Sequence, residues 1–323
     1  CKVYKNNNTT IKVGTSSDSD IEISDNLTDD CVLKYTIYSD NGTMLIPSTI
    51  IDNNYINLNT LANGRYRLEI TATDNAGNES SAQYGYFIID NQSPVVNING
   101  LSNNNESKEL FNNPFDLSVS ISDLDINNAK VTLKTPNGDL IVKETGTITD
   151  KIFVADFGNL KTNGDYILTI TASDRAGNDS INITRRFRID TTAPIIHNVQ
   201  VNGKNINTSS MNYTTSHNSP IFVNFSDNLD EVNVMNLSIT ATKNGITTSL
   251  SNGGSLKEDG EYIISIYATD LAGNRSSLYS FNLTVDTVFP TISTTGVNNG
   301  YYYNKNITPT WKVDDKTASL NVT

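Results

Sequence analysis

Aspartate and asparagine side chains recur at fixed places along this chain. The motif Asp-x-Ala-Gly-Asn occurs three times, at residues 74–78, 174–178 and 270–274. A further Asp stands four residues before a proline in each repeat: Asp90, Asp190 and Asp286. Carboxylate and amide oxygens are the ligands that hard cations such as Ca²⁺ prefer. The same side chains also accept hydrogen bonds from backbone N–H groups in turns, so the pattern supports either cation binding or turn capping.

Groups for nucleophilic or acid–base catalysis are scarce. The only imidazoles are His197 and His217, which do not recur between repeats, and neither lies beside a glycine-framed Ser or Cys. The sequence has no P-loop, no dinucleotide-binding glycine motif and no Cys/His cluster with zinc spacing. Carboxylates are numerous enough for a glycosidase pair, but they recur at loop positions in every repeat, as structural Asp residues do. We therefore expect no enzymatic activity.

Composition narrows the classes of partner. The 323 residues include 23 Lys and Arg against 35 Asp and Glu, a formal net charge of −12. This excess of acid argues against binding nucleic acid or an anionic membrane surface. No apolar run approaches the roughly 18 residues of a membrane span, and we expect no signal peptide in this stretch. Two cysteines are too few for a disulfide-based scaffold.

The Asp-x-Ala-Gly-Asn motifs each follow a strand-like sequence that itself repeats. Apolar residues occupy every second position before the motif, as in Tyr166, Leu168, Ile170 and Ala172. A period of two predicts a strand with one face on a core. Asn-Gly pairs at residues 41–42, 137–138 and 244–245 predict hairpins between alternating runs. The elements that carry the acidic side chains are therefore strand ends and turns.

The spacing of these signals predicts an array of domains. The Asp residues before proline lie 100 and 96 residues apart. We expect three domains, at residues 1–93 (lacking its first few residues), 94–193 and 194–289, and the start of a fourth at 290–323. About seven short strands per repeat, with no helical pattern, predict an all-β, two-sheet antiparallel sandwich.

Individual strands follow from the same alternation. In the second repeat they are expected at 94–98, 115–122, 129–134, 139–143, 151–157, 165–173 and 184–190. The third repeat has a strand at 232–242, and its fifth strand is shortened or lost, because Gly245 and Gly260 are too close together. In the fourth repeat, Trp311 and Val313 occupy the alternating strand positions that face the core in the other repeats, which predicts a buried tryptophan.

The repeated motifs resemble those of a known family. A Gly-x-Tyr at residues 64–66, 164–166 and 260–262 matches the tyrosine corner of immunoglobulin folds. Together with the Asp-x-Ala-Gly-Asn turn and the linker Asp190-Thr-Thr-Ala-Pro194, it resembles the tandem bacterial immunoglobulin-like (Ig-like) domains of surface proteins and adhesins. The resemblance covers the whole chain and implies a tandem array of Ig-like antiparallel β-sandwiches.

The resemblance also implies a function. We expect a non-catalytic, extracellular stalk or spacer at the bacterial cell surface, with its anchor outside this segment, most simply in an adhesin. Its partners would be a host or matrix protein or glycan. The alternatives are an accessory array of a secreted cell-wall hydrolase or glycosidase, and a segment of a phage or viral fibre. Three residues between Asp and Pro leave little slack, so we expect a semi-rigid rod.

In a sandwich of this type, the second-to-third and sixth-to-seventh strand loops lie at the pole where the preceding domain arrives. The acidic residues then gather at three joints, which we propose as calcium sites: Asp90, Asp123, Asp125, Asp174 and Asn178 at the first; Asp190, Asp227, Asp230, Asp270 and Asn274 at the second; Asp286 and Asp315 at the third. Calcium-stiffened joints are also what the resemblance implies. The alternative is that each Asp caps its own turn without an ion.

The two cysteines pose a separate question. The first and third strands of such a sandwich start at the same pole, so Cys1 and Cys31 could meet across the sheets. An oxidising exterior would permit a disulfide between them. The alternative is two unpaired cysteines.

Overall fold

The computed structural model describes residues 2–4, 10–14, 21–22, 31–52, 55–102, 108–145, 151–179, 181–207, 212–215 and 218–315. Within these ranges every regular element is a β-strand. No helix in this part of the chain is long and apolar enough to cross a membrane. Contacts between residues divide the chain into two units, residues 1–189 and 190–323, and each is described by itself.

The first unit begins with a sandwich around one core. Its larger sheet has the order β1 (Lys2–Tyr4), β8 (Gln83–Ile89), β7 (Gly64–Thr73), β4 (Val32–Ser39), β5 (Met44–Ile50). The second sheet has the order β3 (Ile21–Glu22), β2 (Thr10–Gly14), β6 (Tyr55–Asn57). The buried core draws on both sheets and on the segment after β6, and includes Ile37, Ile56, Leu58, Leu68 and Phe87.

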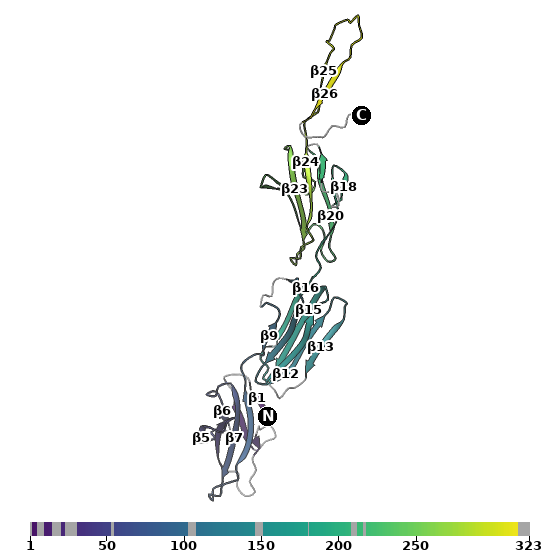
Figure 1. The fold of residues 1–323 in the computed structure, drawn as a ribbon. Coiled ribbons are helices and arrows are strands. Elements are labelled where there is room, and N and C mark those ends of the chain that lie inside the picture. Colours follow the sequence, from purple (N-terminus) through teal and green to yellow (C-terminus); the bar gives the residue numbers. More distant parts are fainter. Residues whose placement is uncertain are drawn as a thin grey trace. The chain divides into compact units, whose positions relative to one another are not determined.

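The second sandwich of this unit is the more regular one (Figure 1). One sheet has the order β10 (Glu109–Phe111), β16 (Ile181–Ile189), β15 (Gly164–Asp174), β12 (Ile126–Lys134), β13 (Leu140–Thr145). The other has the order β14 (Ile152–Leu160), β11 (Phe115–Ser122), β9 (Val95–Asn99). In β15 the predicted alternation is confirmed, because Tyr166, Leu168, Ile170 and Ala172 are all buried in the shared core.

The second unit contains a third sandwich. One sheet has the order β19 (Asn212–Thr215), β24 (Tyr279–Val285), β23 (Gly260–Thr269), β21 (Asn236–Lys243), β22 (Ile246–Leu250). The other has the order β18 (Lys204–Ile206), β17 (Ile195–Val201), β20 (Ile221–Ser226). Residues 251–259 contain no strand, as the short spacing predicts. An isolated bridge between Pro220 and Ser255 stands in its place.

A loop side chain covers the strand edge that the missing strand leaves. The Asn252 amide accepts a hydrogen bond from Val223 N (2.8 Å) and donates one to Val223 O (3.0 Å). Backbone bonds between Ile221 and the pair Gly253–Gly254 continue the pattern. The amide therefore satisfies backbone groups that would otherwise be unpaired at the edge of β20.

Two predictions about these elements are wrong. The strand expected at 232–242 begins only at Asn236, because residues 232–234 lie in a turn in which Val234 N donates to Glu231 O (3.1 Å). Trp311, expected in a core, is 68% exposed. It lies on β26 (Thr310–Asp314), which pairs only with β25 (Thr291–Thr295), and no second sheet faces this hairpin in the described part of the chain.

The tyrosine corner is confirmed in all three sandwiches. Each phenol donates to the carbonyl oxygen four residues upstream: Tyr66 to Ala62 (2.7 Å), Tyr166 to Thr162 (2.9 Å) and Tyr262 to Glu258 (2.9 Å). The short strands that sequence reasoning missed include β10, β18 and β19, which are only three or four residues long. Two of them pair in parallel with the last strand of their sandwich. Their side chains are too few to show a period.

Candidate cation sites

The Asp-x-Ala-Gly-Asn turn places an Asp and an Asn side chain against each other. At the end of β15, Asp174 Oδ1 accepts from Gly177 N (2.7 Å) and Asn178 N (3.0 Å). Asp174 Oδ2 accepts from Asn178 Nδ2 (2.8 Å). Gly177 has φ +78°, a left-handed conformation that favours glycine. These bonds fix the carboxylate at the mouth of the turn.

The same Asn binds the linker that follows β8. Asn178 Nδ2 donates to Asp90 O (3.1 Å) and to Gln92 O (3.0 Å). Asp90 is thereby held beside the turn, and its side chain is fully buried. Its Oδ1 accepts from Gln92 N (3.1 Å), while its Oδ2 is buried without a hydrogen-bond partner.

Four carboxylates meet at this point, which we call the first acidic cluster: Asp90, Asp123, Asp125 and Asp174. Carboxylate oxygens of Asp90, Asp123 and Asp174 all lie within 4.8 Å of one another. Asp125 is 7% exposed, and its Oδ2 is a second buried oxygen without a partner. Arg175 Nη2 lies 3.6 Å from Asp125 Oδ1.

The second acidic cluster consists of Asp190, Asp227, Asp230 and Asp270, and here the loop residue Asp230, not the motif Asp, completes the converging set. Carboxylate oxygens of the first three lie within 4.8 Å of one another. Asp190 is 1% exposed, and its Oδ2 is buried without a partner, as is Asp227 Oδ1. Asn274 Nδ2 donates to Asp190 O (2.6 Å) and to Asp270 Oδ2 (2.7 Å), so the linker is again held by the turn.

The electrostatics of both clusters disfavour charge. Burial raises the pKa of the Asp123 carboxyl to about 6, and the neighbouring Asp90 charge adds to the shift. Burial likewise raises the pKa of Asp190 to about 6, with a further contribution from Asp227. Burial also raises the pKa of Asp125, although the Arg175 charge opposes the shift. Each cluster therefore gains from a proton or a bound cation.

Turn capping explains only part of these contacts. One oxygen each of Asp90, Asp190 and Asp227 accepts from a backbone N–H two residues downstream, as capping requires. The other oxygen of each is buried and has no hydrogen-bond partner. A buried carboxylate oxygen without a donor is costly, and either a shared proton or a bound cation would satisfy it. The donor set is all oxygen and rich in carboxylates, which fits Ca²⁺ better than zinc or copper.

Other predicted site residues are placed differently. Asp286 Oδ1 accepts from Val288 N (3.0 Å), and Asp286 and Asp315 are both partly exposed. Among the described residues, neither belongs to a group of three converging acidic oxygens.

Cys1 lies outside the described residues, so the Cys1–Cys31 disulfide stays a prediction. Arg175 was not singled out from the sequence, although the position after the motif Asp differs in each repeat: Asn75, Arg175 and Leu271.

One imidazole contacts a hydroxyl group. His197 is exposed, and its Nε2 lies 2.6 Å from Ser226 Oγ. His197 is the extra residue of a bulge, where the pairing of β17 with β20 skips from Ile196 to Asn198. The pair lies on an open sheet surface, whereas a nucleophile and base act inside a site that also orients the base.

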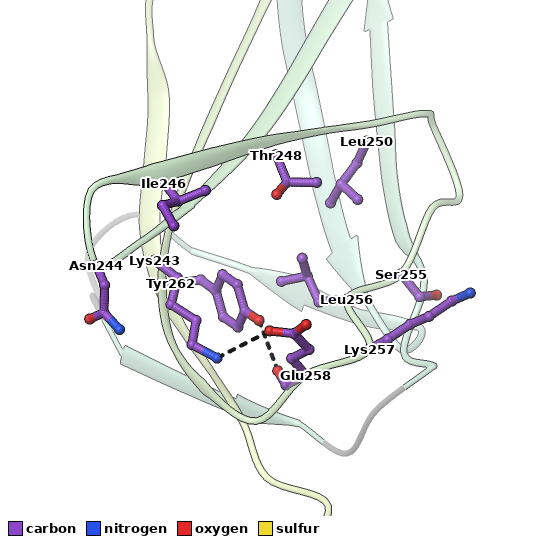
Figure 2. A pocket seen from close by; sticks show the side chains of 10 residues that line it. All are labelled: Lys243, Asn244, Ile246, Thr248, Leu250, Ser255, Leu256, Lys257, Glu258 and Tyr262. Carbon is purple, nitrogen blue, oxygen red and sulfur yellow. Dashed lines mark hydrogen bonds and ion pairs between the residues drawn. The ribbon is translucent and has the colours of Figure 1, made fainter.

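A cavity lies where the third sandwich lacks its fifth strand (Figure 2). It has a volume of about 490 Å³. Lys243 Nζ lies 3.5 Å from Glu258 Oε2 and donates to Asp259 O (2.6 Å), and Tyr262 OH donates to Glu258 O. These polar groups are paired with one another. None of the ten lining residues is a His, Cys or Asp.

A family model confirms the resemblance seen in the motifs. Residues 53–189 match the bacterial Ig-like domain (group 3), from β6 of the first sandwich to the end of the second. The matched residues, 137 of the 323, are similar to the bacterial Ig-like domains. The chain as a whole is an all-β tandem array of Ig-like sandwiches. A search of curated protein sequences finds no match.

Solved structures with a similar arrangement include a tetra-tandem repeat from the extending region of a large adhesion protein, which is 15% identical, with 87% of this chain and 80% of that chain covered and a TM-score of 0.33. A Ca²⁺-stabilised adhesin of an Antarctic bacterium that binds ice is 16% identical, with 84% and 69% covered and a TM-score of 0.24. Fibronectin(III)-like modules of Clostridium thermocellum CbhA are 16% identical, with 59% and 94% covered and a TM-score of 0.28. These values are too low to transfer a function.

Proposed function

We propose that this chain is a non-catalytic, extracellular spacer of a bacterial surface protein, and that it binds calcium at its interdomain segments. The domains are those expected from the repeat, with boundaries at 93, 193 and 289. The observation that carries the proposal is the pair of buried, unpartnered oxygens at Asp90 Oδ2 and Asp190 Oδ2. Both belong to the short linker that joins one repeat to the next.

The charges support an ion at these positions. Four carboxylates share each cluster, and buried like charges repel strongly because water does not screen them. Calcium has two positive charges and takes six to eight oxygen ligands. Linker and loop carboxylates bound to one ion would restrict the linker, which is useful in a spacer that must hold a binding domain away from the cell. An adhesin fits this role, and its ligand would be a host or matrix protein or glycan.

Thermal melting tests the proposal. We expect the melting temperature of the full chain to rise with calcium and to fall when chelator is added in excess. In the double variant Asp90→Asn/Asp190→Asn, which keeps the side-chain shape and one oxygen acceptor, calcium should have little effect. Equal melting temperatures of the unaltered chain in calcium and in chelator would leave turn capping as the sufficient explanation.

A further inference from the structure

One difference between the two acidic clusters is the residue that follows the motif Asp. In the first cluster this residue is Arg175, whose side chain is 36% exposed and whose Nη2 lies 3.6 Å from Asp125 Oδ1. The backbone N of Arg175 also donates to Asp125 O (3.3 Å). The guanidinium is thus anchored against the most enclosed end of the loop between β11 and β12.

In the second cluster the same position is Leu271. Its backbone N donates to Asp230 Oδ2 (2.8 Å), so the chain path beside the cluster is similar. The Leu271 side chain is 49% exposed and has no charge. Asp230 is the acid that contacts this position, as Asp125 does in the first cluster, and it is 8% exposed. Position 271 therefore contributes no positive charge to the second cluster, whereas position 175 contributes a guanidinium to the first.

We propose that Arg175 is a built-in counter-ion that weakens calcium binding at the first cluster, so that the second cluster binds calcium first. The inference rests on the proposed function, because it concerns the same two sites. A guanidinium stays protonated at all physiological pH values, so its competition with the ion is permanent. It neutralises part of the charge that would attract calcium and repels an ion placed beside Asp125.

The counter-ion has an opposite effect on the calcium-free protein. Arg175 neutralises one of four carboxylates, so without calcium the carboxylates repel one another less in the first cluster than in the second. The first joint therefore keeps part of its stability when calcium is scarce, and the second joint depends on the ion. The array would then respond to calcium in two steps, with the residue after the motif Asp setting the concentration of each step.

Calcium titration by calorimetry tests this on the full chain, with one site disabled at a time. The Asp190→Asn chain reports the first cluster, and the Asp90→Asn chain reports the second. We expect the dissociation constant of the first cluster to be at least about tenfold higher, a difference of about 1.4 kcal/mol. In these backgrounds Arg175→Leu should tighten the first site about tenfold, and Leu271→Arg should weaken the second by a similar factor.

The melting temperature in excess chelator is a second measurement, and it also reveals any variant that folds poorly. Arg175→Leu should lower the melting temperature without calcium, and Leu271→Arg should raise it. Asn75→Arg, at the matching position of the first turn, is the control for adding an arginine. Equal affinities of the two sites, or affinities that neither substitution shifts, would overturn this inference while the calcium proposal stands. Absence of calcium binding at both sites would overturn both.

Discussion

The turn at Asp74 and the turn at Asp174 have the same motif and nearly the same hydrogen bonds, but different surroundings. Asp74 Oδ1 accepts from Ala76 N (2.9 Å) and Asn78 N (2.8 Å), and Asp74 Oδ2 accepts from Asn78 Nδ2 (2.8 Å). These bonds, chiefly the one from the Asn78 side chain, lower the pKa of Asp74. Asp74 is partly exposed, whereas Asp174 is 5% exposed.

The difference shows that the motif builds the turn, and that the linker converts the turn into a candidate binding site. Asn178 holds Asp90 against the turn, and the buried carboxyls near it have raised pKa values. The Asp74 turn thus provides an internal reference in which capping operates with the carboxylate near solvent. Effects of cation binding should separate from effects of capping when the same substitution is made at both turns.

The largest expected difference is in calcium affinity. Asp174→Asn should weaken binding at the first cluster at least about a hundredfold, about 2.7 kcal/mol, because it removes a charge that faces the ion. Asp74→Asn should leave calcium binding unchanged, because Asp74 belongs to no acidic cluster and the substitution affects its turn alone. Calorimetry in the Asp190→Asn background measures the first effect. If both substitutions changed calcium affinity alike, the two turns would not differ as described.

The pH dependence of stability should have opposite signs at the first acidic cluster and at the Asp74 turn. The Asp123 pKa is raised to about 6 from an ordinary value near 3.8, so the folded chain holds the proton more tightly than the unfolded chain. In chelator, this contribution is fully present below pH 3.8 and is lost as the pH rises through about 6. At Asp74, where the pKa is lowered, the contribution is present above 3.8 and is lost as the pH falls.

Melting temperatures between pH 3 and 7 in chelator measure these contributions. Asp123→Asn should flatten the decline between pH 4 and 6, and Asp74→Asn should flatten the loss at the acid end. Calcium should remove the decline near pH 6, because ion binding competes with protonation of the same carboxylates. A decline that persists unchanged in Asp123→Asn would show that other groups cause it.

A smaller effect, equal in all copies, is expected at the tyrosine corners. The phenol bonds of Tyr66, Tyr166 and Tyr262 have similar lengths, 2.7–2.9 Å. Each Tyr→Phe substitution should lower the free energy of unfolding by about 1 kcal/mol, the usual net value of one hydrogen bond. Urea unfolding measures this, and calcium should not alter the loss. A loss that depends on calcium would mean that the corner is coupled to the clusters.

Much of the fold was predictable because it recurs. Three copies of one alternating strand, one turn motif and one Gly-x-Tyr are enough to predict the sandwich and the tyrosine corner. The residues of both clusters were predictable for the same reason, because linker and loop acids occupy equivalent places in each repeat. Their burial and the unpartnered oxygens were not, since those depend on how the linker packs against the turn.

The features that sequence reasoning missed depend on single side chains or on absent partners. Arg175 occurs in one repeat only, and its role as a counter-ion is visible only from its distance to Asp125. Asn252 bonds the backbone at the edge of β20 from a loop, and a loop has no alternation of residues from which this could be predicted. Trp311 lies on the strand face that is buried in the other repeats, but this face is buried only where a second sheet covers the strand.

The most direct test of the central claim is a crystal structure of the full chain grown with calcium, with anomalous scattering used to identify the ion. We expect a calcium ion in each acidic cluster, with Asp90 Oδ2 and Asp190 Oδ2 among its ligands at about 2.3–2.6 Å. Clusters that hold only water or protons, with these two oxygens bound to no ion, would contradict the account.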